Sequence, residues 1–328
     1  MKVLVTGGTG FIGSHLVELL LARGHDVRCL VRSTRALRWL RDMPVELVEG
    51  DLFTRDVLAH AVRGTDFIYH SAGVTKARTR AEYYRGNTDG TVNLLKATIA
   101  HNPEIRRFVH VSSQAAVGPS PGREPITEDA PGHPLTSYGK SKWQAEEECR
   151  AVMQQLPVTI VRPSVVYGER DSEVFEFFRT MRMGIQPMVG FHERFVSMIH
   201  VNDLVRGFVM AGETPVAAGQ TYFITSPVAY GWKEIGDVAR RLMKRRALRV
   251  KIPEPAVHVV AACAECVSLF TRKAATINLE KARDMVQDYW TCSPARAKKE
   301  LGFEAAIGLE EGFARTIAWY RAQGWLPS

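Results

Sequence analysis

The sequence predicts an α/β protein, a doubly wound parallel sheet followed by a smaller, mostly helical C-terminal domain. Three observations predict this fold class. Short apolar runs alternate with helical patterns over the first half of the 328 residues, a glycine-rich turn joins the first strand to the first helix, and the alternation stops after Gly168. Such alternation is typical of βαβ units on a parallel sheet, whose ligands bind at the carboxyl ends of the strands.

The individual elements follow from hydrophobic periodicity. In the first half we expect strands at residues 2–6, 25–31, 45–48, 66–70, 108–112 and 158–162, and helices at 11–22, 81–99 and 138–153. In the second half we expect strands at 197–200 and 222–224, and helices at 232–243, 256–270 and 309–320.

The glycine turn predicts a dinucleotide site of the Rossmann type. Residues 6–13 are TGGTGFIG, and small residues there let the backbone approach a pyrophosphate at the positive end of the helix dipole. The strand before the motif and the helix after it favour this interpretation over a merely tight turn. The predicted contacts are Gly7, Gly10, Phe11, Ile12 and Gly13.

The second strand favours NADP(H) over NAD(H). A carboxylate near its end would bind the ribose hydroxyls of NAD and repel a 2′-phosphate. This strand instead ends in Arg32, whose planar and permanently charged guanidinium suits a phosphate. An exposed arginine with no ligand is the alternative, and NAD(H) remains the second choice of cofactor.

Asp51 and Leu52 follow the third strand as part of Gly-Asp-Leu. The Asp51 carboxylate is placed to accept from an adenine amino group while Leu52 covers the ring. A turn-forming aspartate explains the same pattern equally well.

A Ser–Tyr–Lys arrangement predicts the catalytic chemistry. Ser113 closes one strand, and Tyr138 and Lys142 lie four residues apart on one face of a later helix. An unperturbed phenol, with a pKa near ~10, is a poor acid–base group at neutral pH. We expect the ammonium group to lower that pKa and the serine hydroxyl to orient the substrate oxygen.

These motifs resemble the extended short-chain dehydrogenase/reductases. The glycine turn, the Gly-Asp-Leu, HSAG at 70–73, GNTDGT around Asn87, VSS, YGKSK and RPSVVYG at 162–168 occur in the order typical of that family. The resemblance covers nearly the whole chain. It implies a catalytic triad of Ser113, Tyr138 and Lys142, with Lys142 also on the nicotinamide ribose. It also implies that Ala72, Gly73 and Thr75 lie along the cofactor and that Pro163 and Val165 lie beside the nicotinamide.

The domain boundary follows from the change of pattern after Gly168. We expect a dinucleotide-binding domain at 1–168 and a substrate domain at 169–328. Residues of about 197–213 are expected to return to the first domain. Thr75, Gln114, Ser164 and Arg194 are the candidate substrate contacts.

The substrate class is predicted from positions at which this chain differs from the family members that act on nucleotide-linked sugars. Family members that act on nucleotide-linked sugars usually have Asn at the position of Ser164. They often have Arg at the position of Val196, whereas the arginine of this chain, Arg194, lies two residues before that position. The chain looks more like the branch of 3β-hydroxysteroid dehydrogenase-like enzymes and bacterial ceramide reductases. The shared features are HSAGVTKA, the apolar helix before RKAATIN at 272–278, and WTC at 290–292.

The composition of the chain bears on whether it binds nucleic acid or a membrane. The formal net charge is +8, with 43 basic and 35 acidic residues, but no basic run is dense enough for a nucleic-acid arm. We therefore expect no nucleic acid, and the histidines at 70, 110 and 200 are expected to be satisfied within the core. Residues 256–270 are too short for a membrane span, so this helix is either core or in contact with a lipid surface.

The cysteine count predicts a reducing compartment and a cytoplasmic protein. Five cysteines without a pairing pattern do not indicate disulfides, and we interpret the CxxC at Cys263 and Cys266 as part of a buried helix, with no metal site. A peripheral membrane contact and a homodimer both stay open.

The combined prediction is an NADP-dependent oxidoreductase that interconverts a ketone and a secondary alcohol on a lipid-like substrate, such as a 3-oxo-sphingolipid or a sterol. The alternatives are a nucleotide-sugar epimerase or dehydratase with bound NAD(P), and a non-catalytic NADP-sensing protein. The intact triad speaks against the sensor.

Overall fold

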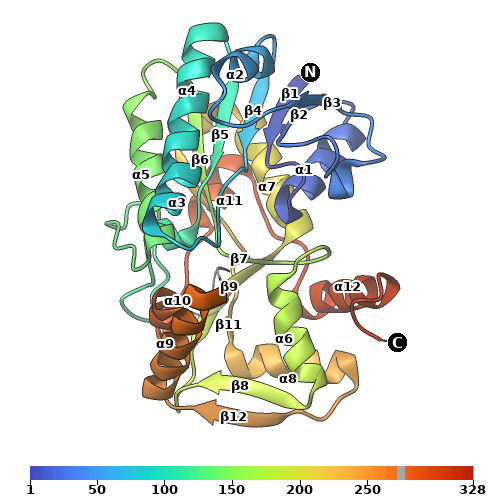
Figure 1. Ribbon diagram of the computed structural model, residues 1–328, viewed down its shortest axis with the longest axis vertical. Coiled ribbons are helices and arrows are strands. Elements are labelled where there is room, and N and C mark those ends of the chain that lie inside the picture. Colours follow the sequence, from blue (N-terminus) through green and yellow to red (C-terminus); the bar gives the residue numbers. More distant parts are fainter. Residues whose placement is uncertain (272–277, 328) are drawn as a thin grey trace.

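The computed structural model describes the backbone of residues 1–271 and 278–327, and the side chains outside 267–277 and 328. A seven-stranded parallel sheet forms the upper part of the molecule (Figure 1). In sheet order its strands are β10 (Thr221–Ile224), β6 (Val158–Pro163), β5 (Arg107–Val111), β4 (Phe67–His70), β1 (Lys2–Thr6), β2 (Asp26–Val31) and β3 (Glu46–Glu49). The reversal between β4 and β1 creates the switch point at which ligands bind in such sheets.

Helices cover both faces of this sheet, which is why its central strands are apolar on both sides. One face packs against α2 (Arg55–Val62), α4 (Gly90–His101) and α5 (Ser137–Ala151). The other packs against α1 (Phe11–Ala22), α7 (Val201–Glu213) and α11 (Ala295–Leu301). Helix α7 therefore lies against α1, although almost the whole first half of the chain separates them.

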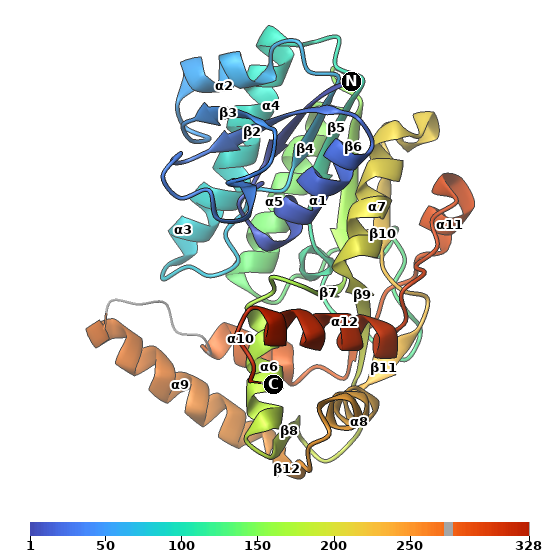
Figure 2. The ribbon, with the colours of Figure 1, turned by 90° about the vertical axis from the view of Figure 1, so that its right-hand side faces the viewer.

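A second group of elements lies below the carboxyl ends of these strands (Figures 1 and 2). A small sheet is built on β9 (Phe195–His200), which pairs with β7 (Val165–Tyr167), β13 (Tyr289–Trp290) and β11 (Ala229–Gly231). A core shared by α6 (Glu173–Arg182), α8 (Trp232–Met243) and α12 (Leu309–Ala322) packs against it.

The lower end of the molecule carries a two-stranded parallel ribbon of β8 (Ile185–Val189) and β12 (Leu248–Ile252). Helix α9 (Glu254–Thr271) leads away from it and packs along α10 (Leu279–Met285) (Figure 2). Among the described residues, no helix has the length and hydropathy that a membrane span requires.

The structure confirms the predicted fold class and most of the predicted elements. It differs at the expected helix 81–99, which consists of α3 (Arg80–Tyr84), a π-helical turn at Arg85–Asp89, and α4. The short strands β7, β8, β11, β12 and β13 were not predicted. β7, β11 and β13 have only two or three residues, too few for an alternating pattern, whereas β8 and β12 have five residues each.

Candidate active site

The glycine turn has the shape that a dinucleotide phosphate requires. Gly7 has a φ of 78°, and a Cβ there would lie 2.7 Å from the backbone nitrogen of Ala72. A Cβ at Gly13 would lie 2.2 Å from the Gly7 carbonyl oxygen. Helix α1 begins after Gly10 with no side-chain cap and no acid in its first turn. The N–H groups of Phe11 and Ile12 are thus available to an anion, which fits the predicted pyrophosphate contact.

Arg32 lies just past the end of β2 and is exposed. The sheet register places Glu49 opposite Val31, and the Thr34 hydroxyl donates to the Glu49 carboxylate at 2.7 Å. An acid therefore lies close to the predicted 2′-phosphate site. Glu49 was not predicted, because it lies on the third strand and only the pairing of β3 with β2 brings its carboxylate to the end of the second strand.

The Asp51 carboxylate organises the turn after β3. Its Oδ1 accepts from the Phe53 backbone N–H at 2.9 Å and from the Thr54 hydroxyl at 3.0 Å, and these bonds, that of Phe53 first, lower the pKa of Asp51. Leu52 packs so closely on Gly90 that a Cβ there would approach its Cδ1 to 2.9 Å. The turn-forming role of Asp51 is therefore present.

Ser113 and Tyr138 meet at the carboxyl edge of the large sheet. Helix α5 is capped by the Thr136 hydroxyl, which accepts from the Gly139 N–H at 3.1 Å, so Tyr138 lies in its first turn. Burial raises the pKa of Tyr138 to about 12, against the influence of the Ser113 side chain, which lowers it. The expectation of a lowered pKa is not met in this structure, because burial outweighs all other influences, and the phenol is protonated at neutral pH.

Lys142 lies one helical turn after Tyr138 and is almost fully buried. Its Nζ donates to the Val111 carbonyl at the end of β5 at 2.6 Å, and burial lowers its pKa to about 8, against the attraction of Glu146. A Cβ at Gly73 would lie 4.0 Å from this Nζ. The ammonium group therefore faces the segment after β4 that the sequence predicts to lie along the cofactor.

Asn87 connects that segment to α5 from within the π-helical turn. Its Oδ1 accepts from the Val74 N–H at 2.7 Å, and its Nδ2 donates to the Val74 carbonyl at 3.1 Å and to the Ser141 hydroxyl at 2.9 Å. Ser141 in turn donates to the Tyr138 carbonyl at 2.7 Å. π-turns inside helices are common at functional sites, and this one fixes the backbone at Tyr138.

His70 extends the network to the glycine turn. Its Nδ1 lies 2.7 Å from the Thr6 hydroxyl and its Nε2 lies 2.9 Å from the Thr91 hydroxyl. Because Thr91 donates its own proton to the Asn87 carbonyl, Nε2 of His70 must be the protonated nitrogen, and Thr6 donates to Nδ1. Thr6 Oγ1 is then an acceptor for the Ala72 N–H at 3.3 Å. Burial lowers the pKa of His70 to about 3 and keeps this neutral tautomer.

The histidine prediction holds for His70 and is wrong for His110. His110 is fully buried beside His70, with ring centroids 5.6 Å apart, yet neither of its nitrogens has a partner within the described residues. His70 is satisfied by two threonines, and none reaches His110. His200 Nδ1 accepts from the Asn202 N–H at 3.3 Å, and its Nε2 lies 3.3 Å from the Glu169 carboxylate.

The remaining candidates lie around the same edge of the sheet. Ala72, Gly73 and Thr75 follow β4, and Thr75 is exposed. β6 ends at Pro163 and β7 begins at Val165, which is 41% exposed.

Two further candidates are buried. Gln114, next to Ser113, is only 3% exposed and its Nε2 has no partner in the described part of the chain. A buried amide donor without an acceptor costs stability, so this one fits a substrate or cofactor oxygen. The Ser164 hydroxyl is paired with that of Thr225 at 2.6 Å.

The Arg194 side chain is buried and bonded to other protein groups. It is 3% exposed, and its guanidinium donates to the Glu254 carboxylate and to the carbonyl oxygens of Val189 and Val286. It thereby joins the end of β8, the start of α9 and the end of α10. These three hydrogen-bond acceptors all belong to the protein, and none of them indicates a substrate. The contact between Arg194 and substrate therefore stays a prediction.

The CxxC prediction is wrong. Cys263 and Cys266 lie on α9 and are both exposed, because only one side of this helix, around Val257 and Ala261, packs against α10 and the ribbon. Within the described residues no cluster of metal-ligating side chains occurs. The motif at 272–277 lies outside the described residues.

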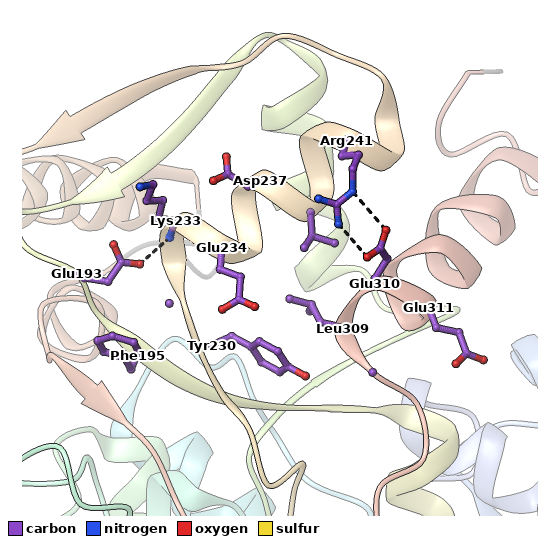
Figure 3. Close-up of a pocket in the computed structure, with 13 residues that line it drawn as sticks. Glu193, Phe195, Tyr230, Lys233, Glu234, Asp237, Arg241, Leu309, Glu310 and Glu311 are labelled. Carbon is purple, nitrogen blue, oxygen red and sulfur yellow. Dashed lines mark hydrogen bonds and ion pairs between the residues drawn. The ribbon is translucent and has the colours of Figure 1, made fainter.

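A cavity of about 810 Å³ lies apart from these residues, between α8, β11 and the start of α12 (Figure 3). Several carboxylate side chains line the cavity. Two of them are paired: Glu310 forms an ion pair with Arg241 at 2.9 Å, and Glu193 accepts from the Lys233 backbone N–H at 2.9 Å. None of the predicted site residues lines it.

Known proteins share this fold and align over nearly the whole of this chain. The model of the NAD dependent epimerase/dehydratase family matches residues 3–224. A ceramide reductase of Caulobacter vibrioides is 34% identical over 326 residues, which cover 99% of this chain and 96% of that protein. A 3β-hydroxysteroid dehydrogenase/Δ5→4-isomerase of Mycobacterium tuberculosis is 30% identical over 345 residues, covering 97% and 90%.

A solved structure, that of gox2253, has a TM-score of 0.83 and 27% identity, with 98% of each chain covered. The glycine turn, helix α5 with Tyr138, and alignments that cover nearly the whole chain all point to the same family. The chain belongs to the NAD-dependent epimerase/dehydratase family, among the extended short-chain dehydrogenase/reductases, and is an NAD(P)-dependent oxidoreductase of that type.

Proposed function

We propose that this protein reduces a ketone to a secondary alcohol on a lipid-like substrate, with NADP(H) as its cofactor. The observation that carries the proposal is the placement of Tyr138 and Lys142 one turn apart at the buried head of α5, where the Lys142 ammonium donates to the end of β5 at 2.6 Å and Ser113 follows that strand. The nicotinamide supplies the hydride when bound.

The protein residues handle the oxygen and its proton. The Ser113 hydroxyl orients the substrate carbonyl, and Tyr138 donates its phenolic proton to the oxygen as the alcohol forms. A phenol whose pKa is raised to about 12 is protonated at neutral pH, so the proton that the reductive direction requires is present. The Lys142 ammonium favours the phenolate that remains, and it faces the ribose side of the site near Gly73.

The lipid-like substrate rests on the relatives. The two proteins with the identities given above are named for a ceramide and for a steroid, and both align over nearly the whole of this chain. Arg194, which would have to be free to hold a sugar diphosphate, is engaged by three protein acceptors. This supports a lipid over a nucleotide sugar.

The preference for NADP(H) rests on Arg32. Its side chain is exposed and, within the described residues, has no acidic partner, so it is available to a 2′-phosphate. The nearby Glu49 carboxylate accepts a hydrogen bond from the Thr34 hydroxyl and forms no ion pair with Arg32.

The test is a reduction assay on the purified full chain with NADPH. We expect a long-chain 3-keto ceramide to be reduced much faster than a short-chain analogue. Tyr138→Phe should lower kcat by about 10²–10⁴-fold while NADPH affinity stays the same. Tyr289→Phe is the matched control, because its hydroxyl has no described partner.

Two results would overturn the proposal. Full activity in Tyr138→Phe would move the chemistry elsewhere. Indifference to chain length, together with thermal stabilisation by a nucleotide sugar, would favour the epimerase or dehydratase.

A further inference from the structure

The β8–β12 ribbon has one apolar face that the rest of the protein leaves partly uncovered. The register pairs Leu248 with Ile185 and Val250 with Pro187, and paired residues point to the same side of a sheet. Leu248, Ile185 and Val250 are 73%, 41% and 37% exposed. An uncovered apolar face on a ribbon of only two strands is a costly arrangement and indicates a partner.

The opposite face of the ribbon is the one that packs on the protein. Gln186 is buried against α8, where its Nε2 donates to the Trp232 carbonyl at 3.4 Å, and Arg249 pairs with Asp237 at 2.5 Å. The apolar face therefore points away from the body. At its far end, Val189 and Ile252 are covered by α9.

Cations surround the open end of this face. Residues 240–251 contain seven basic and no acidic side chains. Three of the seven, Arg240, Arg241 and Arg249, pair with acids. Lys244, Arg245 and Arg246 are exposed and have no ion pair to any described residue.

The turn before β8 adds to the same surface. Arg182 is exposed, Met183 is 65% exposed, and the Leu248 N–H donates to the Gly184 carbonyl at 2.8 Å, so this turn lies beside the start of β12. Arg182 and Arg245 line one small hollow of about 50 Å³. Apolar and cationic side chains thus share one end of the molecule.

We propose that this surface, formed by Arg182, Met183, Ile185, Lys244, Arg245, Arg246, Leu248 and Val250, docks on a membrane that contains anionic phospholipid. Its charge is complementary to lipid phosphates, and its exposed aliphatic side chains suit the boundary between headgroups and acyl chains. A nucleic acid would match the cations but would leave the aliphatic side chains in water. The inference rests on this surface alone and not on the proposed substrate.

The test is co-sedimentation of the full chain with vesicles of phosphatidylcholine, with and without phosphatidylglycerol. We expect binding to the anionic vesicles only, weakened by added salt. Arg245→Gln with Arg246→Gln should lower the partition coefficient roughly fivefold per residue. Leu248→Ser should also lower it, by roughly tenfold. Unchanged melting curves would show that both variants fold.

Matched controls separate the surface from net charge and from general hydrophobicity. Lys96→Gln with Lys299→Gln removes the same charge elsewhere, and Val216→Ser removes an apolar side chain that is 54% exposed. Both should bind vesicles like the original chain.

Several outcomes would overturn the proposal: equal loss in the controls, equal binding to phosphatidylcholine alone, or no binding at all. Retention of duplex DNA without vesicle binding would make the surface a nucleic-acid interface. A dimer that Leu248→Ser dissociates, again without vesicle binding, would make it a contact between two copies.

Discussion

Arg162 on β6 and Glu146 on α5 form a buried ion pair joined by two hydrogen bonds. Arg162 Nε donates to Glu146 Oε1 at 2.9 Å and its Nη2 to Oε2 at 2.7 Å, with both residues at most 1% exposed. The Ser112 hydroxyl donates to the same carboxylate at 2.6 Å. Glu146 lies one turn after Lys142 and two after Tyr138, so the pair fixes the face of α5 that carries both against β6.

Glu146→Gln should be strongly destabilising. It leaves the buried Arg162 guanidinium without a counter-charge, and loss of one partner of a buried pair costs about 3–5 kcal/mol. Glu147→Gln is the control, because that carboxylate is exposed and an exposed pair is worth at most ~1 kcal/mol. Urea unfolding measures both changes, and similar losses in the two variants would contradict this account of the pair.

Reduction should slow as the pH rises through about 8. Burial lowers the pKa of Lys142 to about 8, so its ammonium form is complete below that pH and is lost above it. The pH profile of kcat/KM for ketone reduction measures this. Lys142→Arg should remove the alkaline decline, whatever its overall activity, because guanidinium stays charged. A decline that persists in this variant would assign it to another group.

Arg32→Ser should weaken NADPH binding and leave NADH binding unchanged. The guanidinium–phosphate bond it removes is charge-assisted, and its loss corresponds to about 10–100-fold in Kd. Glu49→Gln should act in the opposite direction, because it removes the acid that the register places near the same site. Fluorescence titration of each dinucleotide reports both effects. Equal affinities for NADPH and NADH in the original chain would refute the assignment of Arg32.

Gly13→Ala should disturb the phosphate turn. Its Cβ would approach the Gly7 carbonyl oxygen to 2.2 Å, and a forced contact of this kind costs about 1–3 kcal/mol. We expect a lower melting temperature and weaker binding of either dinucleotide. Gly122→Ala is the control, since a Cβ there meets nothing within 4 Å. Normal dinucleotide affinity in Gly13→Ala would show that the turn tolerates the methyl group.

Periodicity and turn chemistry were sufficient for the strands of the large sheet and for helices α1, α5 and α8, but not for α2, α7 and α11. The helix predicted at 11–22 is α1 as observed, and the helix at 232–243 is α8. The prediction was poorer where burial depends on distant neighbours. His110 was expected to be satisfied in the core, but it is buried with no hydrogen-bond partner among the described residues. Cys263 and Cys266 were expected on a buried helix, but both are exposed.

The amino-acid sequence by itself determined the individual strands of the large sheet, the glycine turn and the Tyr138–Lys142 spacing, because each depends on residues close together in the chain. Only the tertiary structure decided which groups surround them. The register of β2 with β3 brings Glu49 to the end of β2, and packing engages Arg194 with Glu254. Burial sets the pKa values of Tyr138 and Lys142, since the desolvation of a charge depends on every element packed around it.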